Sequence, residues 1–182
     1  MVNIKKLLNK FTRIKRTANK KNAIIVDIDN TLCETEFIFD EIKKNQLSGA
    51  AKWDYFHSNV QRCPVNAWCM MLVINYLILG YDVIFLTARS EKISKQTEAY
   101  LFQYLPEQFR SNIHLFMRQA DDISPAWNVK EKWLNKIEDA YCFSFAVDDD
   151  IDNCRMFYAR GIPVLCPVHK ELLTKIPSQV LS

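Results

Sequence analysis

The amino-acid sequence predicts an α/β fold in which a mostly parallel sheet carries helices on both faces. Short apolar segments rich in β-branched and aromatic residues alternate with longer helical segments along most of the chain. Such strands are typical of sheets buried on both faces, and their alternation with helices is typical of parallel sheets. One long interruption after the first strand predicts a small additional element.

The first strand is expected over residues 23–28, which begin with the run Ala-Ile-Ile-Val. The first long helix is expected over 64–79, with Pro64 in its first turn and Gly80 as its stop signal. The same patterns predict strands over 83–86, 113–117, 143–147 and 163–166, and helices over 91–105, 128–139 and 151–160. Ligands of such sheets bind beyond the carboxyl ends of the strands, so functional side chains are expected there.

The interruption covers residues 33–63, which are too many for a simple strand-to-helix connection. Long connections in compact domains often act as lids or binding loops, so we predict a small cap over the site. The segment is rich in aromatic residues, namely Phe37, Phe39, Trp53, Tyr55 and Phe56. Of these, Trp53, Tyr55 and Phe56 would either stack on a nucleobase or form the cap's own small core.

The 182 residues fit one domain over 22–182 with a basic N-terminal arm over 1–21. The arm contains eight Lys or Arg and no acidic residue, and the remaining sixteen basic and twenty-one acidic residues give a net charge of −5. Apolar residues recur in the arm at helical spacing, at Ile4, Leu7, Leu8, Phe11 and Ile14. The arm is therefore expected either to pack on the domain as an amphipathic helix or to contact a polyanion, nucleic acid rather than membrane.

The six cysteines include no Cys-x-x-Cys pair, and the start of the chain lacks the apolar core of a signal peptide. We therefore expect reduced thiols and a cytoplasmic location, in the cytoplasm of the host cell if the protein is viral. No membrane span is expected, because the most apolar stretch is too short and stops at Gly80.

Two acids, Asp27 and Asp29, follow the first apolar run with one residue between them. Buried charge without a partner is costly, so this pair suggests a bound cation or a nucleophile beside a proton donor. Asp27 can attack phosphorus and form an aspartyl-phosphate, while Asp29 can protonate the leaving oxygen and then activate water. A phosphate dianion repels both acids, so Mg²⁺ is expected, held by Asp27, the Asp29 backbone carbonyl and Asp148.

Two further residues suit the phosphoryl oxygens of a substrate. Thr87 follows the second apolar strand and offers a hydroxyl, and Lys130 opens a predicted helix and offers an ammonium group. Each residue alone is a weak signal, because threonines end many strands and lysines occupy many exposed helix positions. Their order, each at the expected strand or helix end, predicts a phosphatase.

These residues also carry a family resemblance. Residues 27–31 read Asp-Ile-Asp-Asn-Thr and resemble the DxDxT signature of haloacid dehalogenase (HAD) superfamily phosphatases. Thr87, Lys130 and the pair Asp148 and Asp149 are similar to the second, third and fourth motifs of that superfamily. The resemblance implies a Rossmann-like three-layer α/β/α sandwich, Mg²⁺ and a phospho-aspartate route.

A narrower resemblance concerns residues 86–89, Leu-Thr-Ala-Arg, and 116–118, Phe-Met-Arg. They look like the 3′-phosphatase domain of bacteriophage polynucleotide kinase and its stand-alone relatives. This implies that Arg89 and Arg118 help to hold the phosphate, although Arg89 could instead form a structural ion pair. The chain departs from that family at 122–126, where Asp-Ile-Ser-Pro-Ala replaces Asp-x-Arg-x-Asp.

The fourth motif contains more acids than one metal ion can bind. The resemblance favours Asp148 as the ligand and Asp149 as the residue that supports it. Asp150 is expected to cap the next helix, and Asp152 is an alternative to Asp149.

The sequence thus predicts a Mg²⁺-dependent phosphomonoesterase that acts on a nucleic-acid 3′-phosphate or a nucleotide. The residues expected to contact the substrate are Asn30, Thr31, Arg89 and Arg118. A small-metabolite phosphatase and a non-catalytic module that binds nucleic acid or protein remain as alternatives.

Overall fold

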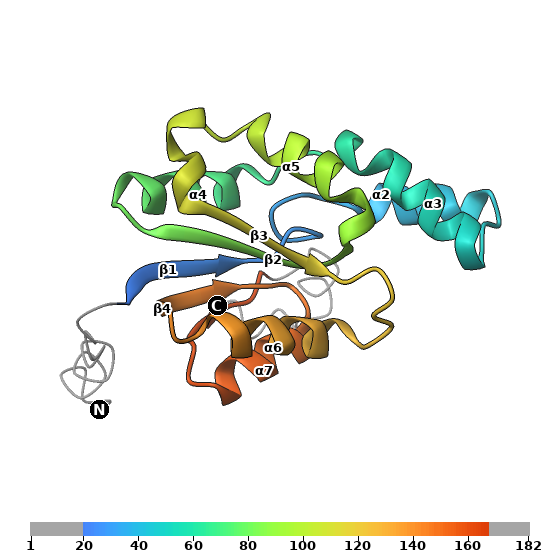
Figure 1. The fold of residues 1–182 in the computed structure, drawn as a ribbon. Helices are drawn as coiled ribbons and strands as arrows, with labels where there is room; N and C mark the ends of the chain where they lie inside the picture. The colour runs from blue at the N-terminus through green and yellow to red at the C-terminus, as the bar shows by residue number, and fades with distance from the viewer. Residues whose placement is uncertain (1–19, 168–182) are drawn as a thin grey trace, which may run out of the picture.

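The computed structural model describes residues 20–167, which form three layers around a five-stranded parallel sheet (Figure 1). The strands are β1 (Lys21–Val26), β2 (Asp82–Ser90), β3 (Ile113–Arg118), β4 (Tyr141–Val147) and β5 (Val164–Leu165). Their order across the sheet is β3-β2-β1-β4-β5, and every neighbouring pair is parallel. The predicted Rossmann-like α/β/α sandwich is therefore confirmed.

Helices cover both faces of this sheet (Figure 1). On one side are α2 (Glu36–Lys44), α3 (Gly49–Asn59), α4 (Ala67–Ile78) and α5 (Ser94–Phe102), and on the other α6 (Ala126–Ile137) and α7 (Ile151–Ala159). Short 3-10 turns occupy Val60–Arg62, Glu91–Ile93 and Glu107–Asn112.

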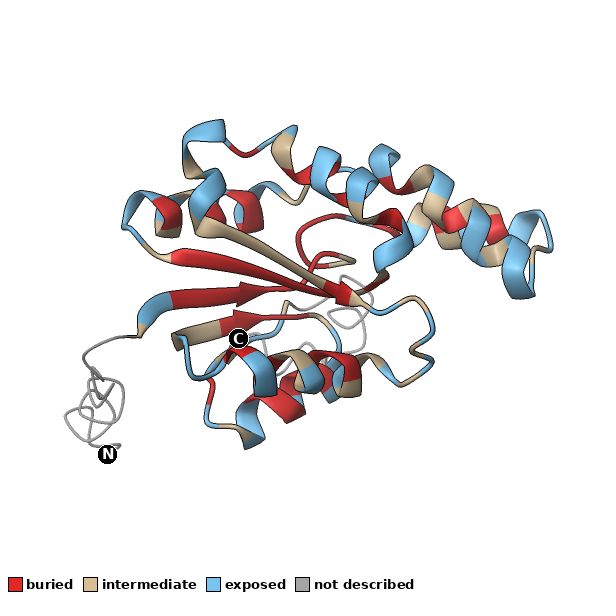
Figure 2. Cartoon of the chain, in the orientation of Figure 1, coloured by how far each residue is buried: buried red, intermediate tan, exposed pale blue. Residues whose placement is uncertain are grey.

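The alternation of side chains along β1 explains why the molecule has two hydrophobic cores. Ile24 and Val26 belong to the core shared with α4 and α5, whereas Ala23 and Ile25 belong to the core shared with α6 and α7. Successive side chains of a strand point to opposite faces, so a continuous apolar run feeds both layers. Figure 2 shows that β1 and β2 are mostly buried, that β3 and the start of β4 are half-buried, and that the outer faces of the helices are exposed.

The start of α4 corrects the sequence-based expectation. Pro64 is not in the first turn of the helix, because the next residue, Val65, forms an antiparallel bridge with Cys33, and Asn66 occupies the N-cap position. Gly80 is confirmed as the stop signal. Its φ of 79° and the bond from the Tyr81 backbone N–H to the Tyr76 carbonyl form a Schellman-type ending.

The other elements differ from expectation mainly at their ends. The helix expected over 91–105 begins instead with the 3-10 turn Glu91–Ile93 and ends at Phe102. The first strand begins two residues earlier than expected and ends at Val26, so Asp27 directly follows it.

Segment 33–63 forms α2, α3 and the turn Val60–Arg62, beside the carboxyl ends of the strands (Figure 1). Its action as a cap stays a prediction. The helix expected within residues 1–19 lies outside the described residues. Among residues 20–167, no helix combines the length and apolar character needed to cross a membrane.

Candidate active site

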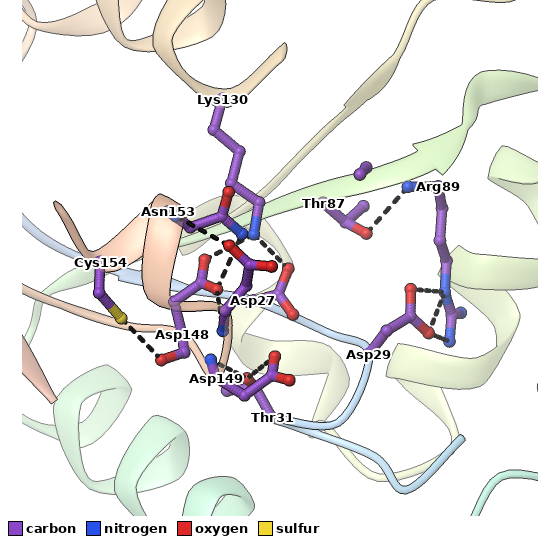
Figure 3. Close-up of polar contacts among 12 residues, drawn as sticks. Asp27, Asp29, Thr31, Thr87, Arg89, Lys130, Asp148, Asp149, Asn153 and Cys154 are labelled. Carbon is purple, nitrogen blue, oxygen red and sulfur yellow. Dashed lines mark hydrogen bonds and ion pairs between the residues drawn. The ribbon is translucent and has the colours of Figure 1, made fainter. Parts of the chain in front are cut away.

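A buried lysine joins two aspartates from neighbouring strands at the carboxyl edge of the sheet. The Lys130 ammonium lies 2.5 Å from Asp27 Oδ1 and 2.6 Å from Asp148 Oδ2. Lys130 and Asp148 are each 1% exposed and Asp27 is 6% exposed. Figure 3 shows the three side chains pointing toward one another.

The fold places these three groups through its backbone. The Asp27 N–H donates to the Val147 carbonyl at 2.9 Å, so β1 and β4 remain paired up to the point where both aspartates leave the sheet. Lys130 comes from α6, which begins just after Pro125 and covers this edge. The arrangement depends on three segments far apart in the sequence.

The charges of the three groups are strongly coupled. Burial raises the pKa of Asp27 well above its usual value, and the nearby Asp148 adds to the rise, while the Lys130 ammonium opposes it. Burial disfavours the charged form of Lys130, but Asp27 and Asp148 outweigh this effect and raise the pKa of its ammonium. Lys130 therefore stays protonated between two carboxylates.

Asp149 adds a third carboxylate beside this pair. Oxygen atoms of Asp27, Asp148 and Asp149 all lie within 4.8 Å of one another. Thr31 holds Asp149 in place, because its hydroxyl donates to Asp149 Oδ1 at 3.2 Å and accepts from the Asp149 N–H at 3.1 Å. Three carboxylates and one ammonium leave a formal charge of −2, and hard oxygen donors of this kind fit a divalent cation such as Mg²⁺.

Asp29 is oriented away from Asp27 and toward Arg89 (Figure 3). Arg89 donates from Nη2 to Asp29 Oδ1 at 2.7 Å and from Nε to both carboxylate oxygens at 3.0 Å. The Arg89 side chain is buried, and although burial opposes it, Asp29 raises the pKa of the guanidinium. The structure thus shows the ion pair that was the alternative role of Arg89, and a contact of Arg89 with the substrate phosphate stays a prediction.

Thr87 lies between the Asp27 cluster and the Asp29–Arg89 pair (Figure 3). Its hydroxyl oxygen accepts from the Arg89 N–H at 3.1 Å, and the residue is fully buried within β2, just after Leu86, where the pairing with β3 becomes irregular. This contact leaves the hydroxyl hydrogen available to donate to another group.

Asn30 and Arg118 hold loops in the described structure. Asn30 has a φ of 58°, and its side-chain oxygen accepts from the Thr35 N–H at 3.1 Å and from the Thr35 hydroxyl at 2.7 Å. Arg118 donates to the carbonyls of Ala88, Asp122 and Ser124. Contacts of Asn30 and Arg118 with a substrate therefore stay predictions.

Asp150 and Asp152 lie at the start of α7, the helix that follows the fourth motif. Asp150 caps α7, as expected, and its side chain accepts from the N–H groups of Asp152 and Asn153. Asp152 pairs with Arg155 at 3.0 Å in the first turn of that helix, whereas Asp149 belongs to the carboxylate cluster.

Sequence reasoning missed two residues around Asp148. The buried Asn153 donates to Asp148 Oδ1 at 2.9 Å, and Cys154 donates to the Asp148 carbonyl at 3.1 Å. Their position in the first turn after the cap Asp150 was an available signal, because that turn of the helix faces back toward the strand end.

Comparison with known proteins identifies the family. A family model described as HAD superfamily, subfamily IIIB (acid phosphatase) matches residues 2–152. No curated protein matches the chain.

Several solved structures share the fold. A chain of the Pnkp1/Rnl/Hen1 RNA repair complex has a TM-score of 0.64 at 23% identity, covering 83% of this chain and 43% of that one. The class C acid phosphatase from Bacillus anthracis with tungstate bound gives 0.61 at 16%, covering 88% and 72%. A haloacid dehalogenase-like hydrolase from Streptococcus pneumoniae gives 0.58 at 11%, covering 87% and 92%. The present chain thus spans less than half the length of the RNA repair chain.

Proposed function

The chain belongs to the HAD superfamily, subfamily IIIB (acid phosphatase), and we propose that it hydrolyses phosphate monoesters through a phospho-aspartate formed on Asp27. It is a phosphoric monoester hydrolase by family. The observation that carries the mechanism is the buried Lys130 between Asp27 and Asp148 at the carboxyl edge of the sheet. An ammonium in this place neutralises charge that collects on the phosphoryl oxygens during transfer.

In the first step, an Asp27 carboxylate oxygen forms a bond to phosphorus, and the bond from phosphorus to the ester oxygen breaks. The leaving oxygen takes the electron pair of that bond and a proton from Asp29. In the second step, water gives a proton back to Asp29 and attacks phosphorus, which releases inorganic phosphate and restores Asp27. Thr87 donates its hydroxyl to a phosphoryl oxygen.

Asp29 must leave its resting position to perform this role. In the described structure its carboxylate accepts hydrogen bonds from Nε and Nη2 of Arg89, and its side chain is 28% exposed. The partial exposure supports a side chain that can turn toward a leaving group. Arg89 then returns Asp29 to a defined position between turnovers.

Asp27, Asp148 and Asp149 are the residues that would hold Mg²⁺, with the Asp29 backbone carbonyl as a further oxygen. The ion, when bound, offsets the charge of the carboxylates and of the substrate phosphate. The donor set supports this assignment, because it contains oxygen ligands alone and carries excess negative charge.

The favoured substrate is a nucleic-acid 3′-phosphate or a nucleotide. The segments 86–89 and 116–118 support this proposal, as does the exposed Trp53 of segment 33–63, which is 50% exposed beside Lys52. A small-metabolite phosphatase is the second candidate. It is favoured by the carbonyl contacts of Arg118, which occupy the guanidinium that a longer substrate would use.

The test measures phosphate release with Mg²⁺ from p-nitrophenyl phosphate, 3′- and 5′-mononucleotides and a 3′-phosphorylated oligonucleotide. Wild type is expected to hydrolyse at least one of them and Asp27→Asn none. If the oligonucleotide stays intact while small esters are hydrolysed, the polynucleotide assignment is wrong. If Asp27→Asn retains wild-type turnover, the proposed nucleophile is wrong.

A further inference from the structure

Helix α4 carries large apolar side chains on its exposed face as well as on its buried face, and the exposed Asn75 is the polar residue between them. The sequence of Ala67–Ile78 contains no charged residue. Its inner face packs in the core through Cys69, Met70, Val73 and Leu77. Its outer face, together with the residue that follows the helix, exposes Trp68 (44%), Met71 (63%), Ile78 (65%) and Leu79 (68%). A cluster of large exposed apolar side chains of this kind is typical of a contact surface.

We propose that the outer face of α4 is the docking surface for residues 4–14 of the same chain. This segment carries an apolar stripe at helical spacing, and residues 1–21 contain no Gly or Pro that would break a helix. An isolated helix of eleven residues is marginal in water, so it needs a surface to pack on. The apolar stripe would cover α4 and leave the basic residues in solvent.

The chain enters the described structure at the place that this docking requires. Lys21, the first residue of β1, lies 3.2 Å from Asp82, the first residue of β2. Asp82 follows Leu79, at the end of α4, by only three residues. The described chain therefore begins at the same edge of the sheet at which α4 ends.

The available chain length also fits. Residues 15–20 can extend over about 20 Å. Residues 4–14 would form a helix of about 16 Å, and α4, with twelve residues, is about 18 Å long. The length of such a helix thus matches the length of the exposed face.

Charge favours this occupant too. The last turn of α4 contains no basic residue, and helix carbonyl ends carry partial negative charge that Lys15 and Arg16 of the connecting residues can offset. The C-terminal residues 168–182 are a poorer fit. They follow β5, at the far edge of the sheet from β2, and Pro177 interrupts them.

Hydrogen exchange of the full chain tests the proposal. We expect the amides of residues 4–14 to exchange at least about tenfold more slowly than an unstructured segment of the same sequence. The double variant Met71→Asp/Ile78→Asp should remove this protection. Tyr158→Asp is the matched control, because Tyr158 is 80% exposed on α7, in the opposite layer, and should leave it intact. Cooperative thermal unfolding of each variant confirms that the domain folds.

A deletion provides a second measurement. Removal of residues 2–18 should lower the Tm of wild type and of Tyr158→Asp, but leave the Tm of the α4 double variant unchanged, because the contact is already lost there. Unprotected residues 4–14 in wild type would overturn the proposal. A wild-type dimer that the α4 substitutions convert to monomer would also overturn it, because the face would then bind a second copy of the chain. The same holds if the α4 substitutions remove hydrogen-exchange protection from residues 168–182 instead of residues 4–14.

Discussion

The two ends of the sheet each bury an aspartate, but they treat its charge in opposite ways. At the carboxyl edge, Asp27 shares the single ammonium of Lys130 with Asp148, and Asp149 lies nearby. At the amino edge, Asp82 is surrounded by nitrogen groups that can donate hydrogen bonds to its carboxylate. It accepts hydrogen bonds from Lys21 Nζ at 3.2 Å and Asn112 Nδ2 at 2.9 Å, and lies 2.9 Å from His114 Nε2.

The pKa values follow this difference. The pKa of Asp27 is raised, whereas burial of Asp82 is outweighed by the hydrogen bonds of Asn112, His114 and Lys21, which lower its pKa. The Asp82 carboxylate at the amino edge is thus paired within the protein. The carboxyl edge carries a net negative charge that a bound cation would offset. Burial together with a surplus of like charge distinguishes the site from structural polar contacts.

The largest effect on activity is expected when the aspartate at the carboxyl edge, Asp27, is replaced by asparagine. Asp27→Asn should lower kcat on p-nitrophenyl phosphate by at least about 10³-fold, because the amide cannot act as the nucleophile. The free energy of unfolding should change by less than about 1 kcal/mol, since the substitution relieves repulsion among the acids. Steady-state kinetics and urea unfolding measure both quantities. A stability loss without a loss of turnover would reverse the roles assigned to this edge.

Lys130→Met should cause the largest loss of stability. Two buried carboxylates lose their shared counter-ion, which costs about 3–5 kcal/mol in the free energy of unfolding. Lys132→Met is the matched control, because Lys132 lies two residues away and its side chain is 52% exposed. Urea unfolding should show a change of no more than about 1 kcal/mol for the control. Equal losses in the two variants would contradict the buried role of Lys130.

Mg²⁺ should stabilise the protein by binding at the carboxyl edge of the sheet, and this effect should not depend on Asp82 at the amino edge. An ion at one hundred times its Kd adds about 2.7 kcal/mol of stability, which raises the Tm of a chain this size by roughly 5–10 °C. Asp148→Asn should remove this shift in a thermal unfolding experiment, and Asp82→Asn should keep it. A shift that survives Asp148→Asn places the ion elsewhere.

Asp82→Asn should have the smallest effect, a loss of about 1–2 kcal/mol in stability with unchanged kcat. The folded pKa of Asp82 lies below the unfolded value of about 3.9, so its contribution is present above that pH and is lost as pH falls through the folded pKa. The gap in unfolding free energy between wild type and Asp82→Asn should therefore narrow progressively as the pH falls below about 4. A gap that is constant over this range would exclude ionised Asp82 as its source.

The fold and the core of the site could be predicted because their signals are local. Apolar β-branched runs specify buried strands, and their ends place Asp27 and Asp148 at one edge. An ion pair of Arg89 was one of the two expected roles, but its partner Asp29 could not be predicted, since the two residues are sixty positions apart and their rotamers depend on the assembled fold. The predicted start of α4 was wrong for a related reason, because Val65 pairs with Cys33, which lies 32 residues earlier in the sequence.

That bridge between Cys33 and Val65 has a consequence for the architecture. Two bonds flank it, from the Glu34 N–H to the Pro64 carbonyl at 3.0 Å and from the Asn66 N–H to the Leu32 carbonyl at 2.7 Å. The intervening residues therefore leave and re-enter the domain through one narrow, hydrogen-bonded neck. Closing a loop costs little more when the loop is longer, so a module of different size and chemistry can be grafted at this neck while β1 and α4 keep their register.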